Sequence, residues 1–155
     1  MSGIVELRNL HKHYQQGELE VKAVDGVSLT IEKGDFAALC GPSGSGKTSI
    51  LNLIGGLDSV TSGQVILEGT DLAECDNAEL AEIRKNRIGF VFQSYNLVPV
   101  MTAYENAAFV LDLQGVDSKI IREKVMKTLA DVGLQGLENR RPDQMSGGQQ
   151  QRVAI

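Results

Sequence analysis

The stretch Gly41-Pro42-Ser43-Gly44-Ser45-Gly46-Lys47-Thr48 fits G-x-x-x-x-G-K-[ST], the pattern of a phosphate-binding P-loop, or Walker A motif. Its glycines let the loop turn backbone N–H groups inward, because glycine adopts positive φ without a Cβ penalty. Lys47 would bring a positive charge to the β- and γ-phosphates, and Thr48 offers a hydroxyl to Mg²⁺. The motif predicts a nucleoside triphosphate bound by Gly41, Pro42, Ser43, Gly44, Ser45, Gly46, Lys47, Thr48 and Ser49.

The residues on both sides of the loop support this interpretation. The continuous apolar run Phe36–Cys40 predicts a parallel strand that is buried on both faces. After the loop, apolar residues at helical spacing predict a helix that ends near Gly55-Gly56: Ile50, Leu51, Leu53, Ile54 and Leu57. A chance glycine turn is the alternative, whereas a Rossmann loop is disfavoured because the glycines read G-x-x-G-x-G before a lysine. Walker A alone leaves small-molecule kinase, GTPase, motor and transporter ATPase open.

Composition limits the class of protein. The 155 residues suit a single domain, 42% of them are hydrophobic, and the net charge of -5 disfavours general nucleic-acid or anionic-lipid binding. No apolar run approaches the roughly 18 residues of a membrane span, and the N-terminus lacks signal-peptide features, so we expect a cytosolic protein. Cys40 and Cys75 have no ligand spacing, which supports neither a disulfide nor a metal site.

Further strands are predicted on both sides of the P-loop. Alternating residues predict strands over Ile4–Leu10 and Val27–Ile31. The apolar run Ile88–Phe92 also reads as a strand and would place Gln93 at its end, where α/β folds bind ligands. Taken alone, a glutamine such as Gln93 is more often a solvated loop residue.

The second half of the chain has helical signals. The segment Thr102-Ala103-Tyr104-Glu105 has the form of a capping box that begins a helix. A later stripe ends at Gly133 and predicts a helix with a buried face: Ile121, Val125, Leu129 and Val132. Ser146 is a good N-cap for a helix that follows.

The segment Met145-Ser146-Gly147-Gly148-Gln149 resembles the LSGGQ signature of the ATP-binding cassette (ABC) family, with Met in place of Leu. Its pairing with Walker A is more specific than either motif alone, and the resemblance covers the whole chain. It implies an α/β P-loop NTPase core with a RecA-like parallel sheet, an N-terminal antiparallel β part and a helical signature subdomain. We expect the β-rich part and core in residues 1–93, and the Q-loop and helical subdomain in residues 94–150.

The resemblance also implies roles for individual residues. Tyr14 matches the aromatic that stacks on adenine, although it could be a surface tyrosine. Gln93 matches the Q-loop glutamine, which contacts Mg²⁺ or the attacking water. The family's signature binds the γ-phosphate of the partner subunit's ATP, which here implies Ser146, Gly147, Gly148 and Gln149. We interpret His11 and His13 as solvated or packed, without a metal role.

Some family motifs are absent from this sequence. A Walker B strand ending in Asp-Glu, a D-loop and a switch histidine do not occur in residues 1–155. The Asp helps to hold Mg²⁺ and the Glu is the usual base, so we expect this stretch alone not to hydrolyse ATP efficiently. Without the family's central strands, buried backbone would also be left unpaired. We therefore expect the chain to be a C-terminally truncated cassette.

Residues 89–97 and 141–155 are similar to the lipoprotein-release and macrolide-export branch of the family. This implies ATP and Mg²⁺ as ligands, a second ATP-binding subunit in a head-to-tail dimer, and a transmembrane permease subunit whose coupling helix would contact Asn96–Met101. The expected location is cytoplasmic and peripheral, on the inner face of the cell membrane, with no nucleic-acid partner. The alternative is a non-catalytic nucleotide-binding or regulatory module.

Overall fold

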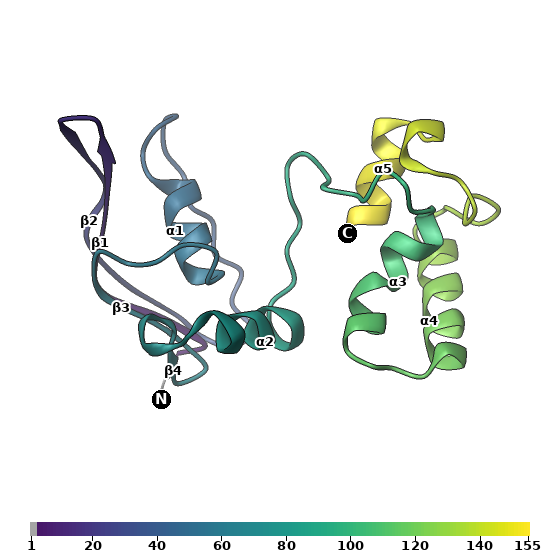
Figure 1. Cartoon of the computed structure of the whole chain (residues 1–155), viewed down its shortest axis with the longest axis horizontal. Coiled ribbons are helices and arrows are strands. Elements are labelled where there is room, and N and C mark those ends of the chain that lie inside the picture. The colour runs from purple at the N-terminus through teal and green to yellow at the C-terminus, as the bar shows by residue number, and fades with distance from the viewer. Residues whose placement is uncertain (1–2) are drawn as a thin grey trace. The chain divides into compact units, whose positions relative to one another are not determined.

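The computed structural model describes residues 3–155, and the chain divides into two compact units (Figure 1). The first unit extends to Arg84, and the second is Lys85–Ile155. No helix in the described residues is long and apolar enough to cross a membrane. The two units are described separately below.

A four-stranded antiparallel sheet forms the body of the first unit, with strand order β2-β1-β3-β4. Its strands are β1 (Val5–Gln16), β2 (Leu19–Ile31), β3 (Ser62–Leu67) and β4 (Thr70–Asp71). The two strands predicted near the N-terminus are confirmed, and each continues into a long hairpin. Gly17 makes the hairpin turn with a φ of 64°, which glycine tolerates without strain.

The helix predicted after the P-loop is confirmed as α1 (Lys47–Ile54), which contacts β2 and β3. Ile50 and Leu53 on its inner face are buried, whereas Leu51 and Leu57 are exposed. The unit also contains the 3-10 turn η1 (Leu72–Glu74), and α2 (Asn77–Arg87) crosses the division between the units.

The two predicted parallel strands, over Phe36–Cys40 and Ile88–Phe92, are wrong as secondary structure. Both runs are irregular, Phe36 is 99% exposed, and Cys40 is exposed where we expected a buried hydrophobe. A strand requires a hydrogen-bonded neighbour, and the ladders described within residues 3–155 do not include either run. Phe90 and Phe92 instead stack on each other, with ring centroids 5.5 Å apart.

The second unit is helical, with α3 (Ala103–Leu113), α4 (Ser118–Asp131), the 3-10 turn η2 (Pro142–Gln144) and α5 (Gly147–Ala154). The predicted capping box is confirmed, because Thr102 and Glu105 bond reciprocally at the start of α3. The hydrogen bond from the Thr102 backbone N–H lowers the pKa of Glu105. The α4 stripe is confirmed as well, although Val132 is only partly buried. The core of this unit consists of Ala103, Ala108, Ile121, Val125, Leu129, Leu134, Met145 and Val153.

Candidate functional site

The P-loop combines three glycines in conformations that L side chains rarely adopt. Gly41, Gly44 and Gly46 have φ values of 151°, 79° and 83°. A Cβ on Gly46 would also clash with the carbonyl oxygen of Ala23 on β2, so the loop approaches the sheet too closely for a side chain. All three positions therefore need glycine for their backbone conformation, and Gly46 needs it for space as well.

Lys47, the first residue of α1, folds back over the loop. Its ammonium donates to the carbonyl oxygens of Gly41 at 2.9 Å and Pro42 at 2.7 Å, and it lies 3.3 Å from Ser45 Oγ. Charged phosphate oxygens are stronger acceptors than neutral carbonyls, so an anion in the loop could replace these contacts. Thr48 is exposed in the first turn of α1.

Tyr14 on β1 lies next to the start of α1. Its hydroxyl donates to Asp58 Oδ2 at 2.7 Å and lies 3.5 Å from Ser49 Oγ. The Lys12 ammonium sits 4.9 Å from the centroid of the Tyr14 ring. The structure thus brings together two predicted site residues, Tyr14 and Ser49, that are 35 positions apart in the sequence.

Sequence reasoning missed Lys12 and Asp58, which hold Tyr14 in place. Lys12 is 8% exposed, and its ammonium donates to Asp58 Oδ1 at 2.7 Å and to the Ser59 carbonyl oxygen at 2.6 Å. Burial acts to raise the pKa of Asp58, but hydrogen bonds from Lys12, Tyr14 and Ser59 outweigh it, so the net pKa is lowered. Residues two apart in a strand lie on the same face, so the sequence of β1 could have linked Lys12 to Tyr14. No local pattern marks Asp58.

Replacing Asp58 with asparagine is expected to lower the free energy of unfolding by about 1–3 kcal/mol at neutral pH, because the buried Lys12 ammonium loses its anionic partner. A lowered folded-state pKa means that the ionised carboxylate stabilises the protein above the ordinary value of 3.8, and that this contribution disappears as pH falls through the folded pKa. The variant should therefore lose less stability on acidification. Urea unfolding over a pH series measures both effects, with exposed Glu18→Gln as a control. Identical pH profiles for Asp58→Asn and the unsubstituted protein would contradict this.

In the second unit, the predicted signature residues form a capped helix start. Ser146 Oγ accepts from the Gln149 N–H at 3.3 Å, and Gln149 Oε1 accepts from the Ser146 N–H at 2.8 Å. Ser146, Gly147 and Gly148 are exposed, while Met145 is buried in the core. Met145, which replaces the family's Leu, thus occupies an apolar core position. The exposed residues at the start of α5 and the positive end of that helix can bind an anion.

Gln93 lies exposed in a turn and not at the end of a strand. Two residues farther on, Tyr95 and Asn96 adopt positive φ values of 59° and 50°, which are uncommon for residues other than glycine. A Cβ on Gly147 would lie 3.3 Å from the Tyr95 hydroxyl, so the segment after Gln93 packs against the signature. Sequence reasoning missed Tyr95, whose proximity to Gly147 is a long-range contact.

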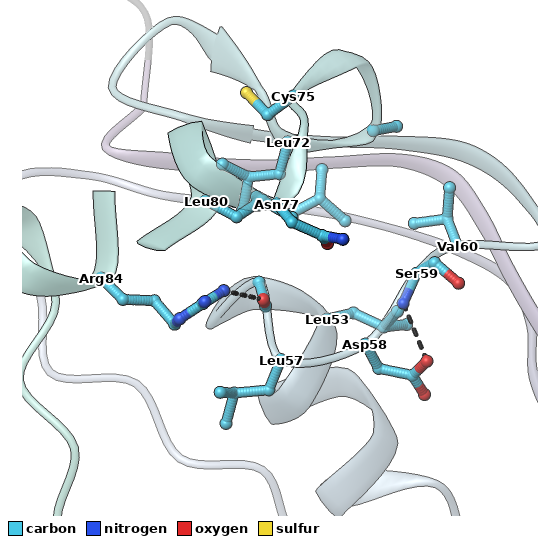
Figure 2. A pocket seen from close by; sticks show the side chains of 13 residues that line it. Leu53, Leu57, Asp58, Ser59, Val60, Leu72, Cys75, Asn77, Leu80 and Arg84 are labelled. Carbon is cyan, nitrogen blue, oxygen red and sulfur yellow. Dashed lines mark hydrogen bonds between the residues drawn. The ribbon is translucent and has the colours of Figure 1, made fainter. Parts of the chain in front are cut away.

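A pocket of about 520 Å³ in the first unit lies apart from the P-loop residues (Figure 2). It is lined by the end of α1, the loop after it, η1 and α2. Arg84 donates to the Gly56 carbonyl oxygen at 2.5 Å beside it. Burial and the carboxylates of Glu79 and Asp71 raise the pKa of the lining thiol of Cys75. The predicted phosphate-binding residues do not line this pocket.

The fold is that of an ABC ATPase cassette. A solved ATP-binding cassette, described as a dimer in a post-hydrolysis state bound to ADP and Pi, matches with a TM-score of 0.90 and 41% identity over 97% of this chain and 66% of that chain. A dimeric bacterial ABC transporter cassette matches with a TM-score of 0.91 and 41% identity, covering 97% of this chain and 67% of that one. A family model described as ABC transporter matches residues 24–155. The chain belongs to the ABC transporter family, as its motifs predicted.

Similar sequences place the chain among ATP-binding proteins of this family. An uncharacterized ABC transporter ATP-binding protein of Thermotoga maritima is 43% identical over 155 residues. A macrolide export ATP-binding/permease protein MacB of Hyphomonas neptunium is 43% identical over 152 residues, or 98% of this chain. The chain spans 66% of the Thermotoga protein and 24% of the Hyphomonas protein.

Proposed function

We propose that the protein is the ATP-binding subunit of an ABC transporter, and that the full-length protein hydrolyses ATP to power transport or mechanical work through a transmembrane partner. The observation that carries this proposal is that one chain of this family holds both phosphate-binding elements. It has a glycine P-loop with Lys47 at the start of its helix, and an exposed, capped helix start at Ser146-Gly147-Gly148. Each element can bind phosphate, and ABC cassettes have been solved as dimers.

Within this proposal, residues 41–49 bind the phosphates and Tyr14 stacks on the adenine ring. The Tyr14 hydroxyl is held by Asp58, which fixes the ring beside α1. Thr48 and Gln93 would hold Mg²⁺, and both are exposed. Their hydroxyl and amide oxygens suit this ion. When bound, Mg²⁺ neutralises charge that develops on the phosphates. For residues 1–155 alone we propose no efficient hydrolysis, because the sequence contains no Walker B acid pair.

The signature residues Ser146, Gly147, Gly148 and Gln149 would bind the γ-phosphate of ATP held by a second ATP-binding subunit. Met145 anchors their helix in the core, and the capping box leaves the Gly147 and Gly148 amides exposed to such a ligand. The dimeric state of the similar solved cassettes supports a second subunit. Two copies of this protein arranged head to tail would supply this second ATP-binding subunit.

We also propose a transmembrane permease partner and a cytoplasmic, membrane-peripheral location. The ATP-binding/permease name of the Hyphomonas relative supports the partner and the macrolide-export or lipoprotein-release branch. Residues 96–101 would contact the partner, and Val100 in this segment is 74% exposed, which suits an apolar contact. The net charge of -5 fits the absence of a nucleic-acid partner.

The alternative is a module that binds ATP and a membrane partner without turnover. Measuring ATP binding and phosphate release with the purified full-length protein and its membrane partner separates the two functions. The proposal expects binding together with ATP-dependent phosphate release. Binding without phosphate release would favour the non-catalytic module, and absence of both would contradict either function.

A further inference from the structure

The β1–β2 hairpin brings two histidines and a carboxylate together on the strands that precede the P-loop. His11 and His13 lie on β1, with ring centroids 6.0 Å apart, and Asp25 lies opposite His11 on β2. One ring nitrogen from each histidine and one carboxylate oxygen of Asp25 lie within 4.8 Å of one another. Sequence reasoning gave these histidines no metal role. The carboxylate that completes the cluster, Asp25, lies on the neighbouring strand.

Hydrogen bonds orient both imidazole rings. His11 Nδ1 lies 3.0 Å from Asp25 Oδ1, and His13 Nδ1 lies 3.1 Å from Glu20 Oε1. An ionised carboxylate only accepts, so His13 Nδ1 must carry the proton and donate it. In the neutral ring, His13 Nε2 then carries no proton and has a free lone pair.

His13 Nε2 is buried and has no hydrogen-bond partner in the described part of the chain. A buried nitrogen without a partner is costly, which makes it unusual in a native structure. A histidine whose other nitrogen donates to a carboxylate is also the arrangement that metal-binding histidines use. His13, whose ring lies in this cluster, therefore carries an unused lone pair on Nε2.

We propose that His11, His13 and Asp25 bind a divalent transition cation of the Zn²⁺ type, with Glu20 as the positioning residue for His13. Neighbouring ligands of a tetrahedral zinc ion with bonds of about 2.1 Å lie roughly 3.4 Å apart. The 3.0 Å separation of His11 Nδ1 and Asp25 Oδ1 is close to this value. The proton that His11 Nδ1 shares with Asp25 must leave when the cation binds, either to His11 Nε2 or to solvent. His13 must approach by a side-chain rotation, because the three ligand atoms lie within 4.8 Å of one another. Two imidazoles select Zn²⁺, Ni²⁺, Co²⁺ or Cu²⁺ over Mg²⁺ and Ca²⁺.

The surroundings allow a cation to enter. The Asp25 side chain is 56% exposed, which leaves access from solvent and room for a water as the fourth ligand. Lys22 Nζ lies 4.0 Å from Asp25 Oδ2 at a similarly exposed position, so it can move away when the cation binds. The site uses none of the residues assigned to ATP, so it stands or fails independently of the proposed function.

Titration of the untagged full-length protein with Co²⁺, followed by visible absorption and then by competition with Zn²⁺, tests the site. We expect saturable binding, displacement by Zn²⁺, and a Zn²⁺-dependent rise in melting temperature. His13→Gln and Asp25→Asn should each abolish the signal. Glu20→Gln should weaken binding by about 10–100-fold, whereas Glu18→Gln, at the hairpin turn, should leave it unchanged.

Circular dichroism confirms that each variant is folded before titration, and the exposed position of Asp25 makes Asp25→Asn the variant least able to disturb folding. Absence of Co²⁺ binding in the unsubstituted protein would overturn the proposal. So would binding that survives both His13→Gln and Asp25→Asn, because the cation would then occupy another site. A thiolate charge-transfer band would likewise place the cation at a cysteine and contradict the assignment.

Discussion

Lys47→Ala is expected to weaken ATP binding by the full-length protein roughly 100-fold or more. Hydrogen bonds to charged groups contribute about 1.5–3 kcal/mol each, and about 1.4 kcal/mol changes an affinity tenfold. Lys47 holds the carbonyl oxygens of Gly41 and Pro42, so its ammonium is already positioned at the mouth of the loop. Isothermal titration with ATP in the presence of Mg²⁺ measures the loss.

The matched control is Lys33→Ala, which removes the same charge from an exposed turn. It should bind ATP with unchanged affinity, since screening makes exposed, distant charges contribute little. Thermal melting of both variants separates lost affinity from lost folding. Unchanged nucleotide binding in a folded Lys47→Ala protein would refute the assignment of residues 41–48 as the phosphate loop.

For Ser146→Arg we expect retained ATP binding with complete loss of ATP-driven dimerisation and hydrolysis. The substitution places a large side chain on the exposed start of α5, where the proposal puts the partner's γ-phosphate. The P-loop belongs to the other unit of the chain and is left intact. Light scattering with and without ATP reports dimerisation, and phosphate release reports turnover.

Loss of the helix cap is a separate effect of this substitution, worth about 1 kcal/mol of stability. Asp117→Arg removes the N-cap of α4 in the same unit and serves as the matched control, because Asp117 accepts from the Lys119 N–H outside the signature. It should keep dimerisation and turnover. Normal turnover in Ser146→Arg would remove the role of the signature in a partner's site.

Local signals predicted much of the fold. The P-loop conformation follows from Gly41, Gly44 and Gly46, whose positive φ values match what the motif requires. The cap at Thr102 was visible because Glu105 follows three residues later, and the cap at Ser146 was visible because serine is a favoured N-cap residue. Such features depend on residues within one turn of each other, so the sequence specifies them without the rest of the fold.

Features that depend on distant partners could not be predicted in the same way. The run Phe36–Cys40 has the composition of a buried strand, but composition does not supply a neighbouring strand, and the run is irregular and exposed. The bond from Tyr14 to Asp58 joins residues 44 positions apart. The His13 environment likewise depends on the register of the hairpin, which places Glu20 and Asp25 near the histidines.

Mixing Lys47→Ala with Ser146→Arg probes the composite ATP site. In a head-to-tail pair of the two variants, one site combines both defects, while the other combines the intact P-loop of Ser146→Arg with the intact signature of Lys47→Ala. Light scattering of the purified full-length variants with ATP is therefore predicted to show dimers in the mixture and monomers for each variant alone. A mixture that stays monomeric with ATP, while the unsubstituted protein dimerises, would contradict a site shared between two subunits.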